Sequence, residues 1–240
     1  MTDAPLLPVL LLGLLFGIQH ATDPDHVIAV ATIVARTGRF GAGALVGAFW
    51  GVGHTVTVTA VGLTLIGFDV PVPPRVGLLL ELVVALMLVG LGVLRIVWAF
   101  RDADAVPGPH RHPHVHPPAR LSRALQMVGP AQALRSALVG LVHGLAGSAA
   151  VALLVLSTIR GTAGALGYLL LFGVGAILGM TAITGLLSLP FTIRAPRMRR
   201  ARRALAFTTG TVSLAFGLYL AFQIGIVDGL FLARAAAALR

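Results

Sequence analysis

The chain contains no cysteine, no lysine and few charged residues of any kind. Cysteine is missing from all 240 residues, which excludes disulfides, thiolate metal ligands and cysteine nucleophiles. Any metal must therefore be bound through histidine, carboxylate, hydroxyl, thioether or backbone oxygen. Charged residues make up 11% of the chain, and the net charge of +10 comes entirely from arginine. A nucleotide-binding loop is also missing, so we expect this chain not to use ATP itself.

Long apolar runs dominate what is present. Hydrophobic residues make up 57% of the chain and its mean hydropathy is +0.94. A membrane-spanning helix needs about 20 largely apolar residues, and a single soluble core does not hide six such runs. The sequence therefore predicts an all-α polytopic membrane protein with six transmembrane helices in one domain, residues 1–240. The runs are Leu6–Ala35, Ala42–Ile66, Val76–Phe100, Leu134–Ile159, Gly164–Pro190 and Ala204–Val227.

The arginines are distributed unevenly between the two sides of this predicted bundle. Cytoplasmic loops of membrane proteins carry an excess of positive charge. We therefore expect a multi-pass protein of the cell (inner) membrane, with its odd-numbered loops in the cytoplasm and both termini outside. The arginines are assigned to topology and lipid headgroups, not to nucleic acid. Fourteen lie in the odd-numbered loops (36, 39, 95, 101, 111, 120, 123, 135, 194, 197, 199, 200, 202 and 203) and four on the other side (75, 160, 234 and 240).

Two short segments recur at nearly equal offsets. GIQHA at 17–21 matches GLVHG at 140–144, and GVG at 51–53 matches GVG at 173–175. Three spans per half would make the second half cross the membrane in the opposite sense. We therefore expect inverted repeats at 6–100 and 134–227, joined by a loop at 101–133, with a substrate site at a broken helix near the midplane. Pro24 is the expected break, because proline donates no hydrogen bond and clashes with the preceding turn.

The first run carries the polar motif HATDPDH, from His20 to His26. Such groups are costly in hydrocarbon, so we expect them to face the bundle interior and to meet a partner. Imidazoles and carboxylates together suit borderline divalent cations such as nickel, cobalt or zinc. His20 and Asp23 can share a helix face, but only a distortion at Pro24 also brings Asp25 to them. The alternative is a polar helix end, with Asp23 capping a helix that starts at Pro24.

Other polar residues lie within the spans. His54 is a candidate ligand, or a histidine bonded to a neighbouring helix. His143 is the repeat partner of the first motif histidine, and a role lining the pathway is favoured over direct ligation. Met180 and Ser148 are weaker pathway candidates, since packing and helix hydrogen bonds also explain them. Glu81 either snorkels to the outer interface or relays ions.

The long third loop contains alternating histidines in a proline-rich segment. Such a segment is typical of a disordered, metal-collecting tract, and its ion binding should weaken below about pH 6.5 as imidazole is protonated. A solubilising linker is the alternative. The residues are His110, His112, His114 and His116.

These motifs resemble those of the nickel/cobalt transporter superfamily. The family's first motif is usually written HAFDADH, from which HATDPDH differs at two positions, and a second motif of the type LGHSTVV is similar to VGHTVTV at 52–58. The resemblance implies a metal pathway formed by His20, Asp23, Asp25, His26 and His54. The chain has no counterpart of the acidic FDTATE motif of the eight-span permeases. Its six-span length and HGLAGSAA at 143–150 look more like the short branch that includes urease-accessory-type membrane proteins.

The sequence therefore predicts a secondary permease for Ni²⁺ or Co²⁺ and not an enzyme. The ion is the substrate, and no permanently bound cofactor is expected. We expect His20, Asp25 and His26 to coordinate the ion, with Asp23 and His54 completing or orienting the shell. The expected partners are the bilayer and a cytoplasmic metallochaperone; the oligomeric state stays open. The alternatives are an efflux permease, a membrane accessory protein that delivers metal to a maturing enzyme, and a membrane-embedded metalloenzyme. The last would need a separate acid or base, and Glu81 is the one spare acid within the predicted spans.

Overall fold

The computed structural model describes residues 6–34, 39–68, 73–101, 127–145, 159, 161–189 and 199–231. Every regular element in these ranges is helical, so the predicted all-α fold is confirmed. The helices are α1 (Leu6–His20), α2 (Pro24–Val34), α3 (Phe40–Phe68), α4 (Pro74–Arg101), α6 (Pro130–Gly144), α8 (Thr162–Ser188) and α9 (Arg199–Phe222), which continues into the π-helix η4 (Gln223–Val227).

Four helical stretches are long and apolar enough to cross a membrane: Phe40–Thr64, Pro74–Arg101, Thr162–Ser188 and Arg203–Val227. Their outer surfaces are apolar too, as at Leu79 and Leu86 of α4, which are 50% and 56% exposed. Exposed apolar side chains along a helix suit contact with lipid. The structure is therefore consistent with a membrane protein. Six spans are not confirmed, because the first predicted span is divided between two shorter helices and residues 146–158 lie outside the described part.

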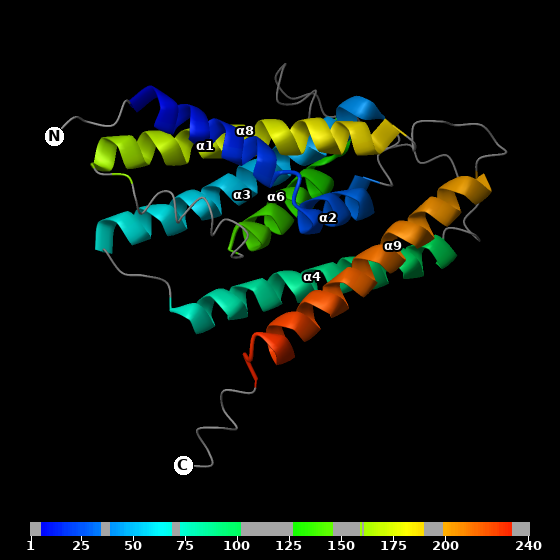
Figure 1. Cartoon of the computed structure of the whole chain (residues 1–240). Coiled ribbons are helices and arrows are strands. Elements are labelled where there is room, and N and C mark those ends of the chain that lie inside the picture. The colour runs from blue at the N-terminus through cyan, green and yellow to red at the C-terminus, as the bar shows by residue number, and fades with distance from the viewer. Residues whose placement is uncertain are drawn as a thin grey trace, which may run out of the picture.

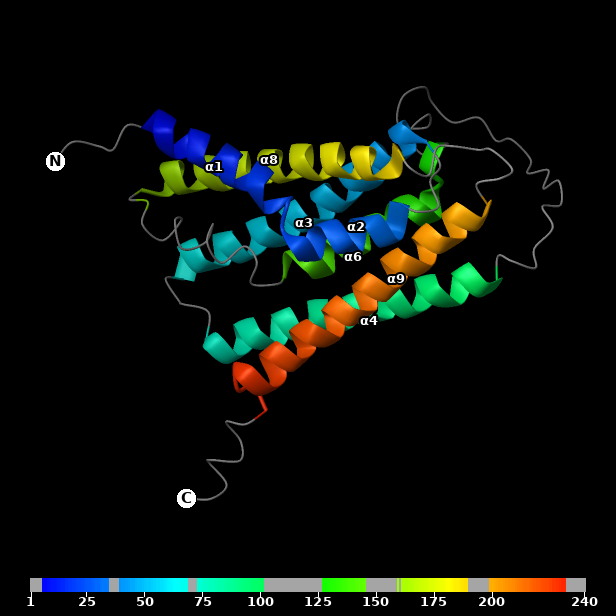
Figure 2. The same cartoon turned by 45° about the vertical axis from the view of Figure 1, so that its right-hand side comes forward.

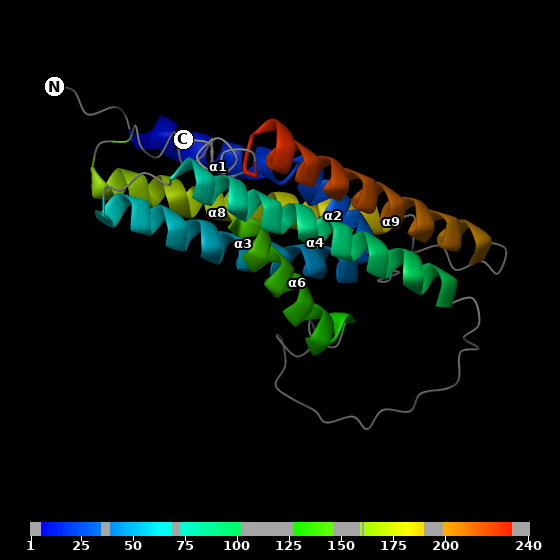
Figure 3. The same cartoon turned by 90° about the horizontal axis from the view of Figure 1, so that it is seen from below.

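The helices form two groups joined by α2. In the first group, α8 packs against α1 and α3, and α6 packs on α3; in the second, α4 packs along α9 (Figures 1 and 2). The view from below shows α4 and α9 side by side, with α6 at an angle to the other helices (Figure 3). Helix α2 contacts α8 in the first group and both helices of the second. An apolar core that includes Val30 of α2, Trp50 of α3 and Leu88 of α4 completes this junction.

Glycine allows two helix pairs of the first group to approach closely. A Cβ atom at Gly17 of α1 would clash with the carbonyl oxygen of Phe172 in α8, and one at Gly175 of α8 would clash with that of Leu14 in α1. Small residues at such crossings let backbones touch and gain dispersion energy. The pair α1–α8 is therefore held by reciprocal backbone contact.

The pair α3–α6 repeats this arrangement. A Cβ atom at Gly53 of α3 would meet the carbonyl oxygen of Ala137, and one at Gly140 of α6 would meet that of Trp50. Gly17 and Gly140 occupy matching positions in the two recurring sequence segments, as do Gly53 and Gly175. Equivalent glycines of the two recurring segments therefore form both the α1–α8 and the α3–α6 crossing.

We predict that Gly17→Ala destabilises the protein by roughly 1–3 kcal/mol, because the added methyl group overpacks a backbone contact. The measurement is thermal unfolding in detergent. The matched control is Gly90→Ala in α4, where an added Cβ atom meets nothing within 4 Å and alanine favours the helix. Equal melting temperatures for Gly17→Ala and the unmodified chain would contradict the close crossing.

Candidate metal site

Four buried histidines meet where α1, α2, α3 and α6 converge. His20 is the last residue of α1, His26 lies in the first turn of α2, His54 lies within α3, and His143 is next to the end of α6. His20 is 6% exposed and the other three are 0% exposed. The sequence therefore brings together imidazoles that lie up to 123 residues apart.

The turn between α1 and α2 makes this convergence possible. The backbone N–H of Thr22 donates to the Gln19 carbonyl at 2.8 Å, and that of Asp23 donates to the His20 carbonyl at 3.1 Å. Helix α2 then starts at Pro24, a position that needs no N–H partner. The helix break expected at this proline is present. It folds the chain so that the His20 and His26 rings lie with centroids 4.5 Å apart.

One group of possible ligands consists of His20, His26 and His54, each with a nitrogen within 4.8 Å of the others. The Nε2 atoms of His20 and His54 are 3.0 Å apart. Two imidazole nitrogens bound to one ion at about 2.1 Å, with an angle of about 90–110°, lie roughly 3.0–3.4 Å apart. The spacing of this pair therefore fits two ligands of one ion, and it also fits a hydrogen bond between neutral rings.

A second group shares His26 and consists of Asp25, His26 and His143. The Asp25 carboxylate bridges the two rings: Oδ1 lies 3.1 Å from Nδ1 of His26, and Oδ2 lies 2.8 Å from Nε2 of His143. Asp23 makes a similar contact, with Oδ2 at 2.9 Å from Nδ1 of His20. Each carboxylate of the motif is thus engaged with an imidazole.

Three imidazole nitrogens remain buried with no hydrogen-bond partner among the described residues: Nε2 of His26, Nδ1 of His54 and Nδ1 of His143. Burying an unsatisfied polar atom costs about 1–3 kcal/mol. A neutral imidazole nitrogen without a proton carries a lone pair that a metal ion can use. Trp50 closes one side of the group, with its ring stacked on His26 at 6.1 Å between centroids.

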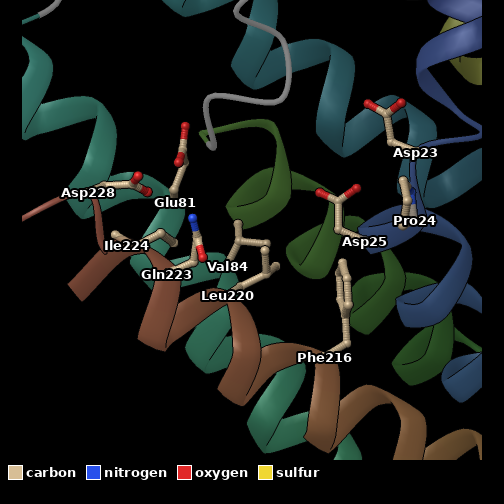
Figure 4. A pocket seen from close by; sticks show the side chains of 10 residues that line it. All are labelled: Asp23, Pro24, Asp25, Glu81, Val84, Phe216, Leu220, Gln223, Ile224 and Asp228. Carbon is tan, nitrogen blue, oxygen red and sulfur yellow. The ribbon is translucent and has the colours of Figure 1, made fainter. Parts of the chain in front are cut away.

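A cavity of about 350 Å³ lies beside the cluster, between α2 and the α4–α9 pair. Figure 4 shows the carboxylates of Asp23 and Asp25 on one side of it, and those of Glu81 and Asp228 on the other. The Asp25 side chain is 15% exposed, whereas those of His26 and His143 are 0% exposed. The cavity therefore meets the buried cluster at Asp25.

The structure brings together all five residues that the resemblance assigned to the metal pathway. His143, which the sequence analysis named as a candidate to line the pathway, lies in the same cluster, and its bond to Asp25 was not predicted. Glu81 lies in the cavity wall, while Met180 packs in the apolar core. Sequence reasoning missed Asp228, although an acid directly after the last apolar run was a signal for it. Ser148 and the loop histidines His110, His112, His114 and His116 lie outside the described residues.

The chain is similar to a curated relative, the urease accessory protein UreH of Bacillus sp. (strain TB-90). The two are 36% identical over 231 residues, which is 96% of this chain and 98% of the relative. The similarity therefore extends over almost the whole chain. No family model and no solved structure matches the chain.

We predict that Ni²⁺ or Co²⁺ quenches the fluorescence of Trp50, because an ion held at the cluster would lie close to its ring. The chain has two tryptophans, so each is measured alone, in Trp98→Phe and in Trp50→Phe protein in detergent. Strong quenching is expected in the first variant and little in the second, with Mg²⁺ as the control ion. Equal quenching of both variants would argue against an ion at the cluster.

Proposed function

The chain belongs to the family of the urease accessory protein UreH, and we propose that it carries a divalent transition-metal ion across the membrane. Nickel is the preferred substrate in this proposal, because a urease accessory role points to nickel handling; cobalt is the second choice. The ion is a substrate and not a resident cofactor.

The observation that carries the proposal is the group of four buried histidines within apolar helices. Polar groups in such surroundings are expensive and mark ion or substrate pathways. Imidazole nitrogen suits nickel, cobalt, copper and zinc, whereas magnesium and calcium take oxygen ligands. The buried nitrogens of His26, His54 and His143 that have no partner in the described part of the chain support the same class of ion.

An inverted repeat supplies the proposed mechanism. Helices α1, α3 and α4 of the first half correspond to α6, α8 and α9 of the second. In support, α1 crosses α8 and α6 crosses α3 through equivalent glycines, and the third helices α4 and α9 pack on each other. In this proposal the chain has six spans and opens the site alternately to either side of the membrane. The repeat partners His20 and His143 then both lie against His26, with ring centroids 4.5 and 4.1 Å from its own.

The cavity beside Asp25 is the proposed route between the cluster and one side of the membrane. Its carboxylates, from Asp23, Asp25, Glu81 and Asp228, attract cations, because low-dielectric walls focus their field. The arginine distribution supports an orientation with the odd-numbered loops in the cytoplasm and both termini outside. In that orientation the loop at 101–133 faces the cytoplasm, where its histidines collect ions or meet a metallochaperone.

We propose transport and not catalysis. A metalloenzyme needs a general acid or base beside its metal, and both cluster carboxylates are bonded to imidazoles. The second candidate function is delivery of metal to a maturing enzyme without transport, which the name of the relative, a urease accessory protein, favours. The two differ in whether the chain alone moves ions across a bilayer.

We predict that proteoliposomes containing only this chain take up radioactive nickel, and that His26→Ala lowers the initial rate at least about tenfold because a central imidazole is lost. The control is Met180→Leu, a nearly volume-conserving change in the apolar core, which should keep the rate of the unmodified chain. Nickel binding without flux would favour the accessory role, and unchanged flux in His26→Ala would contradict the site.

We predict that Glu81→Gln slows uptake several-fold at low ionic strength, and that the difference shrinks in high salt, because screening weakens attraction by the cavity carboxylates. Glu81→Asp keeps the charge and should restore most of the rate. The measurement is the initial rate against salt concentration at a fixed low nickel concentration. A rate that does not respond to Glu81→Gln at any salt concentration would place the route elsewhere.

A further inference from the structure

We infer that the transported ion is bound by imidazole nitrogen alone, and that Asp23 and Asp25 position the imidazoles from outside. The inference rests on the proposed function and deepens it, because it specifies the ligand set of the same site. It departs from the sequence-based expectation that Asp25 is itself a ligand. It follows from which nitrogen of each histidine ring donates a hydrogen bond to a carboxylate.

Asp23 determines which nitrogen His20 presents. An ionised carboxylate only accepts hydrogen bonds, so its contact with Nδ1 of His20 at 2.9 Å places the ring proton on that nitrogen. The lone pair of a neutral His20 ring then lies on Nε2. This is the nitrogen that faces Nε2 of His54 at 3.0 Å.

Asp25 does the same for two rings at once. Its Oδ1 accepts from Nδ1 of His26 at 3.1 Å and from the backbone N–H of His26 at 3.0 Å, while its Oδ2 accepts from Nε2 of His143 at 2.8 Å. The lone pairs of the two neutral rings then lie on Nε2 of His26 and Nδ1 of His143. These are two of the three buried nitrogens without a partner among the described residues.

Each of the two carboxylates therefore already accepts a hydrogen bond from an imidazole, whereas the ring atoms left open are nitrogens. His20, His26 and His54 supply the three nitrogens within 4.8 Å of one another. His143 of α6 bonds to Asp25, and Asp25 bonds to His26. This chain of hydrogen bonds holds the His26 ring in place. Outer carboxylates of this kind orient histidine ligands and raise their basicity, and their loss typically costs about 10–100-fold in metal affinity.

An all-nitrogen set explains selectivity among dications. Magnesium, calcium and manganese prefer carboxylate, carbonyl and water oxygen, while imidazole suits nickel, cobalt, copper and zinc. The carboxylates would attract every dication into the cavity. Because they do not ligate at the cluster, the imidazoles alone would select the ion.

The test uses Co²⁺ binding to the full chain in detergent, with His110, His112, His114 and His116 changed to glutamine so that the loop does not bind the probe. Visible absorption reports the donor set, and X-ray absorption counts the imidazoles around cobalt. We expect Asp25→Asn and His143→Gln to bind Co²⁺ about 10–100-fold more weakly, yet to show the unmodified spectrum and imidazole count at saturation. His26→Gln should lose one imidazole and shift the absorption bands.

The outcomes separate the two proposals. A carboxylate oxygen bound to cobalt in the unmodified chain, or a changed donor set in Asp25→Asn at saturation, would overturn the inference and leave transport intact. No Co²⁺ or Ni²⁺ binding by the unmodified chain would instead defeat the proposed function. If Asp25→Asn does not fold, as judged by gel filtration and thermal unfolding, Asp23→Asn applies the same test to His20.

Discussion

The Asp25 carboxylate, which accepts hydrogen bonds from imidazoles on two different helices, is the interaction on which the rest of the site depends. It ties the start of α2 to the end of α6, and so joins the first half of the chain to the second. The bond exists because α1 stops at His20 and α2 begins at Pro24; an unbroken helix would not turn Asp25 toward His143. Proline, carboxylate and imidazole thus act together as one structural unit.

Much of this unit was predictable from the sequence, for reasons that are local. Histidine and aspartate inside an apolar run have to face other protein groups, and Asp23-Pro24 is a typical helix start. The bond between Asp25 and His143 was not predictable, since it joins residues 118 positions apart and depends on how α6 crosses α3. The position of Asp228 in the cavity wall was not predictable for the same reason, because it depends on α9 packing along α4. The two short helices in place of one span follow from the break, whose position was predicted but whose effect on helix length was not.

Helix α2 has a special place between the two groups of helices. It contacts α8 on one side and the α4–α9 pair on the other, and its first turn carries both Asp25 and His26. Movement of the α4–α9 pair relative to the remaining helices would therefore change the cavity next to Asp25, while the glycine crossings keep α1 on α8 and α6 on α3. Within the first group the helices touch backbone to backbone, whereas the two groups touch each other through side chains. Alternating access requires this combination of rigid groups and a deformable contact between them.

The sharing of His26 between the two ligand groups limits occupancy. Two dications that shared this imidazole would lie on the order of 5 Å apart and repel each other by roughly 10 kcal/mol, even at an effective dielectric constant of about 20. If the cluster binds a dication as proposed, it would therefore hold one ion at a time. A carrier with such a centre moves one ion per cycle and transfers two positive charges each time, unless protons travelling the other way balance them.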